Sequence, residues 1–110
     1  MIKPIANLSV EVIPQAIINR PVWDVVGKYA EISKDTDELD TYEGASFKLD
    51  SNLEIAVRHY QGHPKNTSTI YIDRKINNVA EITYLIRKIL KEFDLSPDFL
   101  AWERAKDPDL

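Results

Sequence analysis

In the first third of the chain the hydrophobic residues are spaced first as in a strand and then as in a helix. From Ala6 to Val12 apolar and polar residues alternate, which is the period of a half-buried strand. Pro14 cannot donate to a sheet ladder, so we expect this strand to end before it. After Pro21 the apolar residues of segment 22–33 fit helical spacing better than alternation. We predict a helix there and keep a strand as the alternative, because valine, tryptophan and tyrosine also favour strands.

The middle of the chain has the clearest alternation. Segments 45–49 and 53–60 flank Asp50-Ser51-Asn52, whose side chains favour a tight turn, so a hairpin is predicted. A longer turn over 61–66 leads to a third strand, 68–73. Alternation puts the apolar residues of these strands on one face, namely Leu53, Ile55, Val57, Ile70 and Ile72.

Helical spacing returns in the C-terminal part. An apolar stripe runs from Val79 to Phe93, preceded by Asn78 as a capping residue. Ser96 and Pro97 mark a second helix start, and we predict a short helix that carries Phe99, Leu100 and Trp102. Residues 106–110 are expected to form a loose tail.

These elements predict an α+β fold: an antiparallel sheet of three to five strands, with helices packed mainly on one face, in a two-layer arrangement. A chain of 110 residues is the usual size of one domain, and no repeat or linker divides it. We therefore expect residues 1–110 to be a single domain.

The composition bears on the cellular location of the protein and on the classes of partner that it can bind. The chain has no cysteine, no apolar run of signal-peptide length and none long enough for a membrane span, which favours a cytoplasmic protein without membrane contact. The net charge is -4, and five acidic residues with no basic one lie between 35 and 43. This window, expected to be a solvated loop, argues against duplex nucleic acid as a partner.

Known catalytic and metal-binding patterns fail on spacing. An EF-hand loop that began at Asp35 would need an oxygen ligand, a glycine and a glutamate where the chain has Leu39, Asp40 and Ser46. His59 and His63 are four residues apart, but one ends a strand and the other lies in a turn. There is no nucleophile elbow or phosphate-binding loop. We predict no catalytic residue, metal or cofactor, and the sequence leaves open whether the protein is an enzyme.

The face of the sheet opposite the apolar one provides the candidate site. We expect it to expose Arg58, Tyr60, Tyr71 and Asp73, with His63 and Lys65 in the turn above. Tyrosine and arginine are enriched at the energetic centres of interfaces. His59 falls in register with the apolar face, where a structural histidine is the simpler interpretation.

Two hypotheses follow. The first is a non-catalytic interaction module that self-associates, as a dimer or larger, or binds a protein. The second is a small-ligand-binding domain, or an enzyme, with a site on or beside the sheet, completed by Trp23 or Trp102. The candidate binding residues are Arg58, His59, Tyr60, Tyr71, Asp73 and Trp102.

Overall fold

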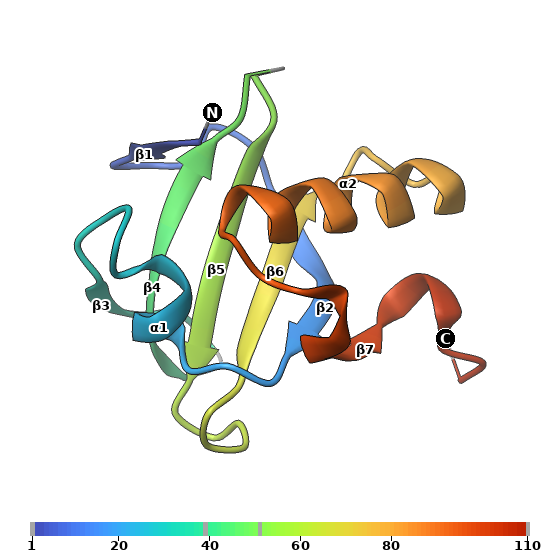
Figure 1. Ribbon diagram of the computed structural model, residues 1–110. Coiled ribbons are helices and arrows are strands. Elements are labelled where there is room, and N and C mark those ends of the chain that lie inside the picture. The colour runs from blue at the N-terminus through green and yellow to red at the C-terminus, as the bar shows by residue number, and fades with distance from the viewer. Residues whose placement is uncertain (1, 39, 51, 110) are drawn as a thin grey trace.

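The computed structural model describes residues 2–38, 40–50 and 52–109, and in them one antiparallel sheet of seven strands (Figure 1). The strands are β1 Lys3–Ile5, β2 Val12–Ile18, β3 Ser33–Thr36, β4 Thr41–Lys48, β5 Glu54–Tyr60, β6 Ser68–Asp73 and β7 Leu100–Glu103. The helices are α1 Val22–Val26 and α2 Val79–Glu92, with 3-10 turns at Pro97–Phe99 and Arg104–Lys106. The α+β class is confirmed, and the sheet has more strands than the three to five predicted.

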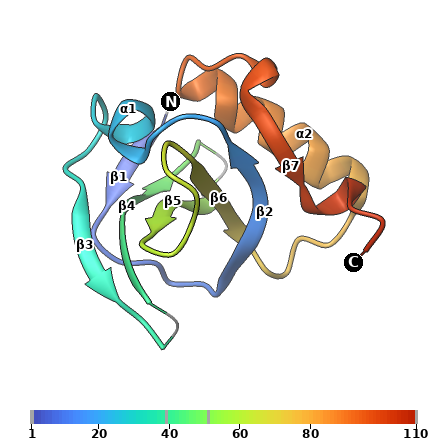
Figure 2. The same cartoon turned by 90° about the horizontal axis from the view of Figure 1, so that it is seen from below.

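The sheet is built around the predicted meander of β4, β5 and β6. Its order is β1-β4-β5-β6-β2-β7, and β3 also pairs with β4. The first half of β4 pairs with β3 and the second half with β1, so two short strands share one edge. Figure 2 shows how strongly the strands curl around the axis of β5 and β6. The hairpin between β4 and β5 is confirmed, although Ser51 of its turn lies outside the described residues.

The main core lies between one face of the sheet and the two helices. The predicted inward residues Ile55, Val57, Ile70 and Ile72 are fully enclosed in it, whereas Leu53 is only partly buried against it. Phe47 of β4 and Ile86, Ile89 and Leu90 of α2 complete its fully enclosed centre. We call this the helix-covered face. The opposite side of the sheet, which bears Ala56, Arg58, Tyr60, Thr69 and Tyr71, is called the second face.

The second face is covered as well, which the sequence did not predict. Leu8 and Val12 pack against a cluster of Ala56, Tyr60 and Tyr71, because segment 6–11 runs along the side of the sheet opposite α2 (Figure 2). Glu54 holds segment 6–11 against the sheet. Its carboxylate accepts hydrogen bonds from both the backbone N–H (2.6 Å) and the hydroxyl of Ser9. These bonds lower the pKa of Glu54.

The strand predicted over 6–12 is therefore wrong. Residues 6–11 form no strand; alternation there reflects packing onto the second face. The strand begins at Val12 and continues through Pro14, with a register shift between Pro14 and Ala16 that leaves Gln15 as the extra residue. β7 pairs with β2 only along Ala16–Ile18, so Pro14 lies where β2 is an edge and its missing N–H costs no ladder bond.

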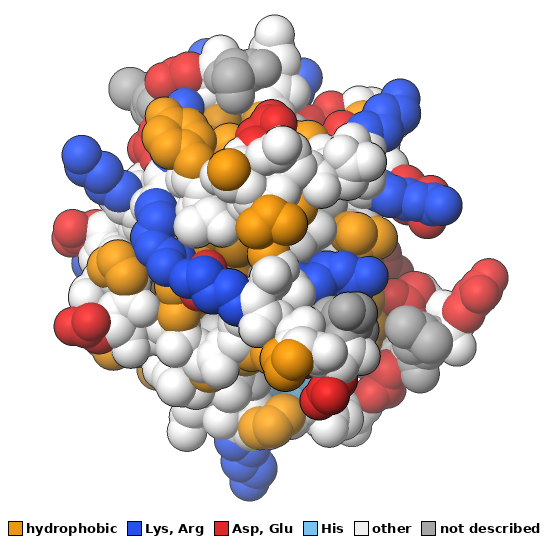
Figure 3. Space-filling view, turned by 90° about the vertical axis from the view of Figure 1, so that its right-hand side faces the viewer, with side chains coloured by type: hydrophobic (Ala, Val, Ile, Leu, Met, Phe, Trp, Pro, Cys, Tyr) orange, Lys and Arg blue, Asp and Glu red, His pale blue; other side chains and the backbone are white. Residues whose placement is uncertain are grey.

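Helix α2 is confirmed with its cap. The side chain of Asn78 accepts from the backbone N–H of Glu81 at 3.0 Å, and an apolar stripe faces the sheet. The outer side of α2 carries an exposed Tyr84 one turn before Arg87 and Lys88. On the side of the molecule where α2 and the C-terminal segment lie, lysine and arginine side chains are interspersed with hydrophobic ones (Figure 3).

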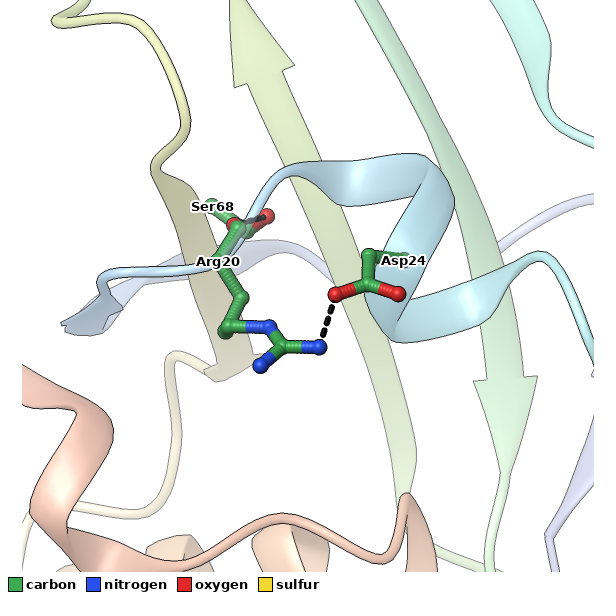
Figure 4. A network of polar contacts seen from close by, with 3 residues as sticks. All are labelled: Arg20, Asp24 and Ser68. Atoms are coloured by element: carbon green, nitrogen blue, oxygen red, sulfur yellow. Dashed lines mark hydrogen bonds and ion pairs between the residues drawn. The ribbon is translucent and has the colours of Figure 1, made fainter.

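The helix predicted over 22–33 forms only as α1, Val22–Val26; residues 27–32 are not helical and Ser33 begins β3. Arg20 orders this corner: its side chain pairs with Asp24 of α1, and its backbone carbonyl accepts from the hydroxyl of Ser68 at 2.6 Å (Figure 4). The guanidinium also lies 4.9 Å from the ring centre of Phe99. The corner thus joins β2, β6 and the C-terminal segment.

Two further predictions, the helix after Ser96 and the acidic loop, differ from the structure. Ser96 caps a turn, but that turn ends at Phe99, whose carbonyl accepts from Asn19 N–H at 2.8 Å, and the chain continues as β7 rather than as the predicted helix. The free edge of β2 provides backbone partners for this strand. The acidic window is also no simple loop, because Asp35 lies in β3 and Glu43 in β4. In the described part of the chain no helix is long and apolar enough to cross a membrane.

Candidate functional site

A cavity of about 620 Å³ opens on the second face. Sheet register explains its floor, because Thr69 of β6 pairs with Ile17 of β2 and Ile17 pairs with Trp102 of β7, so the three side chains lie in one row across the strands. Aromatic rings and two turns complete the lining, which consists of Pro14, Ile17, Asp40, Tyr60, Gly62, His63, Thr69, Tyr71 and Trp102.

Tyr60 is the centre of an aromatic cluster. It is 7% exposed, and its ring centre lies 5.0 Å from that of Tyr42, 6.3 Å from that of Tyr71 and 5.6 Å from that of His63. Its hydroxyl donates to Asp37 in the turn between β3 and β4. Burial and this bond both raise the pKa of Tyr60, so its hydroxyl stays protonated and acts as a fixed donor.

Arg58 braces the cluster from the side. Its guanidinium carbon lies 4.6 Å from the ring centre of Tyr42 and 4.9 Å from that of Tyr71, and it donates to the hydroxyl of Tyr60 at 3.4 Å. Burial raises the pKa of Tyr71 despite the nearby guanidinium, so this hydroxyl is also protonated at neutral pH. Arg58 does not line the cavity; it lines a neighbouring hollow of about 630 Å³ between segment 4–8 and β4.

Two carboxylates, Asp40 and Asp107, hold residues of the cavity lining in place. Asp40 accepts from the backbone N–H of Thr41 at 2.7 Å and from that of Gly62 at 3.1 Å, which ties the β3–β4 turn to the β5–β6 turn. Asp107 accepts from the indole N–H of Trp102 at 2.6 Å, and this bond lowers the pKa of the Asp107 carboxyl. The lowered pKa keeps the Asp107 carboxylate ionised at neutral pH, against the ring of Trp102. Asp40 lies in the wall of the cavity.

The structure brings together four of the six predicted site residues. Arg58, Tyr60 and Tyr71 share the second face, and Tyr60, Tyr71 and Trp102 line one cavity. The expectation that these tyrosines are exposed is wrong: Tyr60 and Tyr71 are each 7% exposed, because segment 6–11 and the β3–β4 turn cover them.

The other predicted residues lie elsewhere. The ring nitrogen Nδ1 of His59 is 2.8 Å from the carbonyl of Thr67, as expected of a structural histidine. Asp73 is at the far end of β6, where its carboxylate accepts from Lys75 N–H at 2.9 Å. Trp23 is 63% exposed on α1, outside the cavity lining.

Sequence reasoning missed Ile17, Asp40 and the bracing ring of Tyr42. Ile17 fell between two prolines in a stretch without an assigned element, although its place in an apolar run was a usable signal. Asp40 was noticed as one acid of a charged window and as a mismatch to an EF-hand loop, not as a site residue. Its position beside Gly62 depends on two turns that are distant in sequence, and no local pattern reports that distance.

The lining of the cavity is mainly aromatic and aliphatic. Among the described residues no group of three or more histidine, cysteine, aspartate or glutamate side chains is placed to hold a metal ion. Among the hydrogen bonds of the same residues, none joins a serine or threonine hydroxyl to a histidine ring, which is the pairing that activates a hydroxyl nucleophile. What the cavity offers is aromatic surface with negative charge at its rim.

Comparison with protein families, with curated proteins and with solved structures gives no match to this chain.

Proposed function

We propose that this protein is a non-catalytic binding domain that holds a small ligand in the aromatic cavity of its second face. The observation that carries the proposal is the convergence of Tyr60, Tyr71 and Trp102, from three different strands, on one cavity of about 620 Å³. Cavities that bind small molecules usually have volumes of about 300–1,000 Å³ and mainly apolar or aromatic walls with a few polar groups.

Preorganisation of the walls supports the same proposal. Tyr60 is held by Asp37, Trp102 by Asp107, and Tyr71 by the guanidinium of Arg58. Side chains fixed in this way lose little conformational entropy when a ligand binds, so more of the contact energy contributes to affinity.

A titration followed by NMR tests the proposal. Indole and 3,3-dimethylbutan-1-ol serve as neutral probes against ¹⁵N-labelled protein. We expect the largest shift changes at Gly62, Thr69 and the indole N–H of Trp102. Ile17→Trp, which fills the floor of the cavity, should abolish them, and the volume-conserving Ile17→Leu should retain them. Shift changes confined to other surfaces, or equal effects of the two substitutions, would refute the cavity as the site.

Self-association is a second proposal, now placed on helix α2 instead of the sheet. Tyr84 is 64% exposed on its outer side, beside Arg87, Lys88 and Lys91. Exposed aromatic and arginine side chains are enriched in interfaces. We expect a dimer or larger species by light scattering at micromolar concentration, reduced by Tyr84→Ser. A monomer mass over the whole concentration range would refute this proposal.

We also propose a cytoplasmic location. The support is the absence of cysteine, which fits a reducing compartment. Fractionation of cells that express the tagged protein tests it, and recovery in a membrane or secreted fraction would contradict it.

A further inference from the structure

We propose that the ligand of the aromatic cavity is a small organic cation, of the quaternary ammonium class. This inference rests on the proposed binding function of the cavity and adds the chemistry of what it takes. Three observations support it: the charges around the lining, the hydrogen bonds that the aromatic residues donate to carboxylates, and the guanidinium of Arg58 that already lies over rings of the same cluster.

The charge around the cavity is negative. Asp40 is in its wall, and neither lysine nor arginine is among the residues that line it. Two further carboxylates accept hydrogen bonds from lining residues: Asp37 from the hydroxyl of Tyr60 and Asp107 from the indole N–H of Trp102. The nearest guanidinium, that of Arg58, lines the neighbouring hollow and not this cavity. An anionic ligand would therefore meet Asp40 in the wall, whereas a cation would meet complementary charge there.

The electrostatic potential of the aromatic rings also favours a cation. The face of an aromatic ring carries negative electrostatic potential, most strongly in tryptophan. The indole N–H of Trp102 donates to a carboxylate at 2.6 Å and the hydroxyl of Tyr60 donates to another, and donation to an anion increases the electron density of the ring. The ring of Trp102 therefore attracts a cation more strongly than an isolated tryptophan does, whereas in Tyr60 the bond that its hydroxyl accepts from Arg58 opposes this effect.

The aromatic cluster already holds one cation of its own. The guanidinium of Arg58 lies over the rings of Tyr42 and Tyr71 at 4.6 and 4.9 Å. That group faces the neighbouring hollow and leaves the cavity walls free of basic side chains apart from the imidazole of His63. A ligand cation in the cavity would repeat, against Tyr60, Tyr71 and Trp102, an interaction that the fold makes beside it.

Two probes of the same shape separate the contribution of charge to binding from that of shape. Choline and 3,3-dimethylbutan-1-ol differ in having a quaternary nitrogen or a quaternary carbon. The experiment uses the 110-residue chain with Trp23→Phe, so that Trp102 is its remaining tryptophan, and follows its fluorescence. We expect choline to bind roughly tenfold more tightly, which corresponds to a cation–π contribution of about 1.4 kcal/mol.

Removal of the wall charge is the second arm. Asp40→Asn should weaken choline binding by roughly threefold to tenfold, the usual effect of one nearby charge in a partly solvated site, and leave binding of the alcohol unchanged. Glu38→Gln is the matched control, because this residue belongs to the same turn but is exposed and does not line the cavity. Retained binding of the alcohol also shows that each variant is folded.

Each result decides between the two proposals. Tighter choline binding that depends on Asp40 and not on Glu38 supports the cation. Equal binding of both probes overturns the cation inference and leaves the binding function standing. If neither probe changes the fluorescence of Trp102 or the NMR shifts of the cavity, both proposals fail.

Discussion

Replacement of Trp102 by alanine tests whether its indole forms part of a cavity wall. A tryptophan that is fully enclosed costs about 3–5 kcal/mol when it is truncated to alanine. Trp102 is only partly buried; it pairs with Ile17 across the strands and lines the cavity with it. About half of the full cost is therefore expected, roughly 1.5–2.5 kcal/mol.

Urea denaturation followed by far-UV circular dichroism measures this loss. The expected change lowers the midpoint by about 1 M, since m-values of small domains are about 1–3 kcal/mol/M in urea. Trp23→Ala is the matched control: Trp23 is 63% exposed, and its removal should change the free energy of unfolding by less than about 0.5 kcal/mol.

Two outcomes would refute the wall position. A midpoint for Trp102→Ala equal to that of Trp23→Ala would mean that the indole projects into solvent. A loss of about 4 kcal/mol or more would mean that it is enclosed and that no cavity adjoins it.

Three further predictions concern the sheet. Gly44→Ala should destabilise by about 1–3 kcal/mol in the same urea assay, because the added Cβ would lie 2.3 Å from the Val57 carbonyl oxygen; an unchanged midpoint would disprove that close approach. The pKa of Glu54 is lowered below its ordinary value of 4.5, so its bonds to Ser9 stabilise the fold above that pH and are lost as pH falls below it. Glu54→Gln should therefore flatten the acid limb of the melting temperature measured between pH 7 and pH 3, and an identical limb would contradict the Ser9 contact. Truncation after Asp94 removes β7 together with Phe99 and Leu100, which pack against the main core, so we expect an unfolded or aggregated product by circular dichroism; a cooperative melt at the original temperature would overturn this.

Local signals were enough for the parts of the fold that were predicted correctly. Alternation from 53 to 60 and the capping asparagine before α2 act within a few residues, and both are confirmed. Segment 6–12 and the stretch after Ser96 carry equally good local signals and were misread. In both, a distant partner decides the conformation: the second face for Leu8 and the free edge of β2 for β7.

In the candidate site, too, local patterns predicted some features and the tertiary fold decided the others. Alternation alone places Arg58 and Tyr60 on one face of β5, and the same rule puts Tyr71 beside them. It does not report what covers a face, so the burial of both tyrosines was not predicted. The convergence of Asp40, Gly62 and Trp102 depends on turns and on strand order, which are properties of the tertiary fold.

The divided edge of β4 has a consequence for solubility. A long, flat edge strand is a template on which another chain can add and aggregate. Here one side of the sheet ends in two short strands instead: β1 has three residues with a proline at its centre, and β3 is polar and exposed along its whole length. On the other side β7 has four residues. Each edge of the seven-stranded sheet is therefore short or interrupted by a proline, which disfavours the addition of another chain.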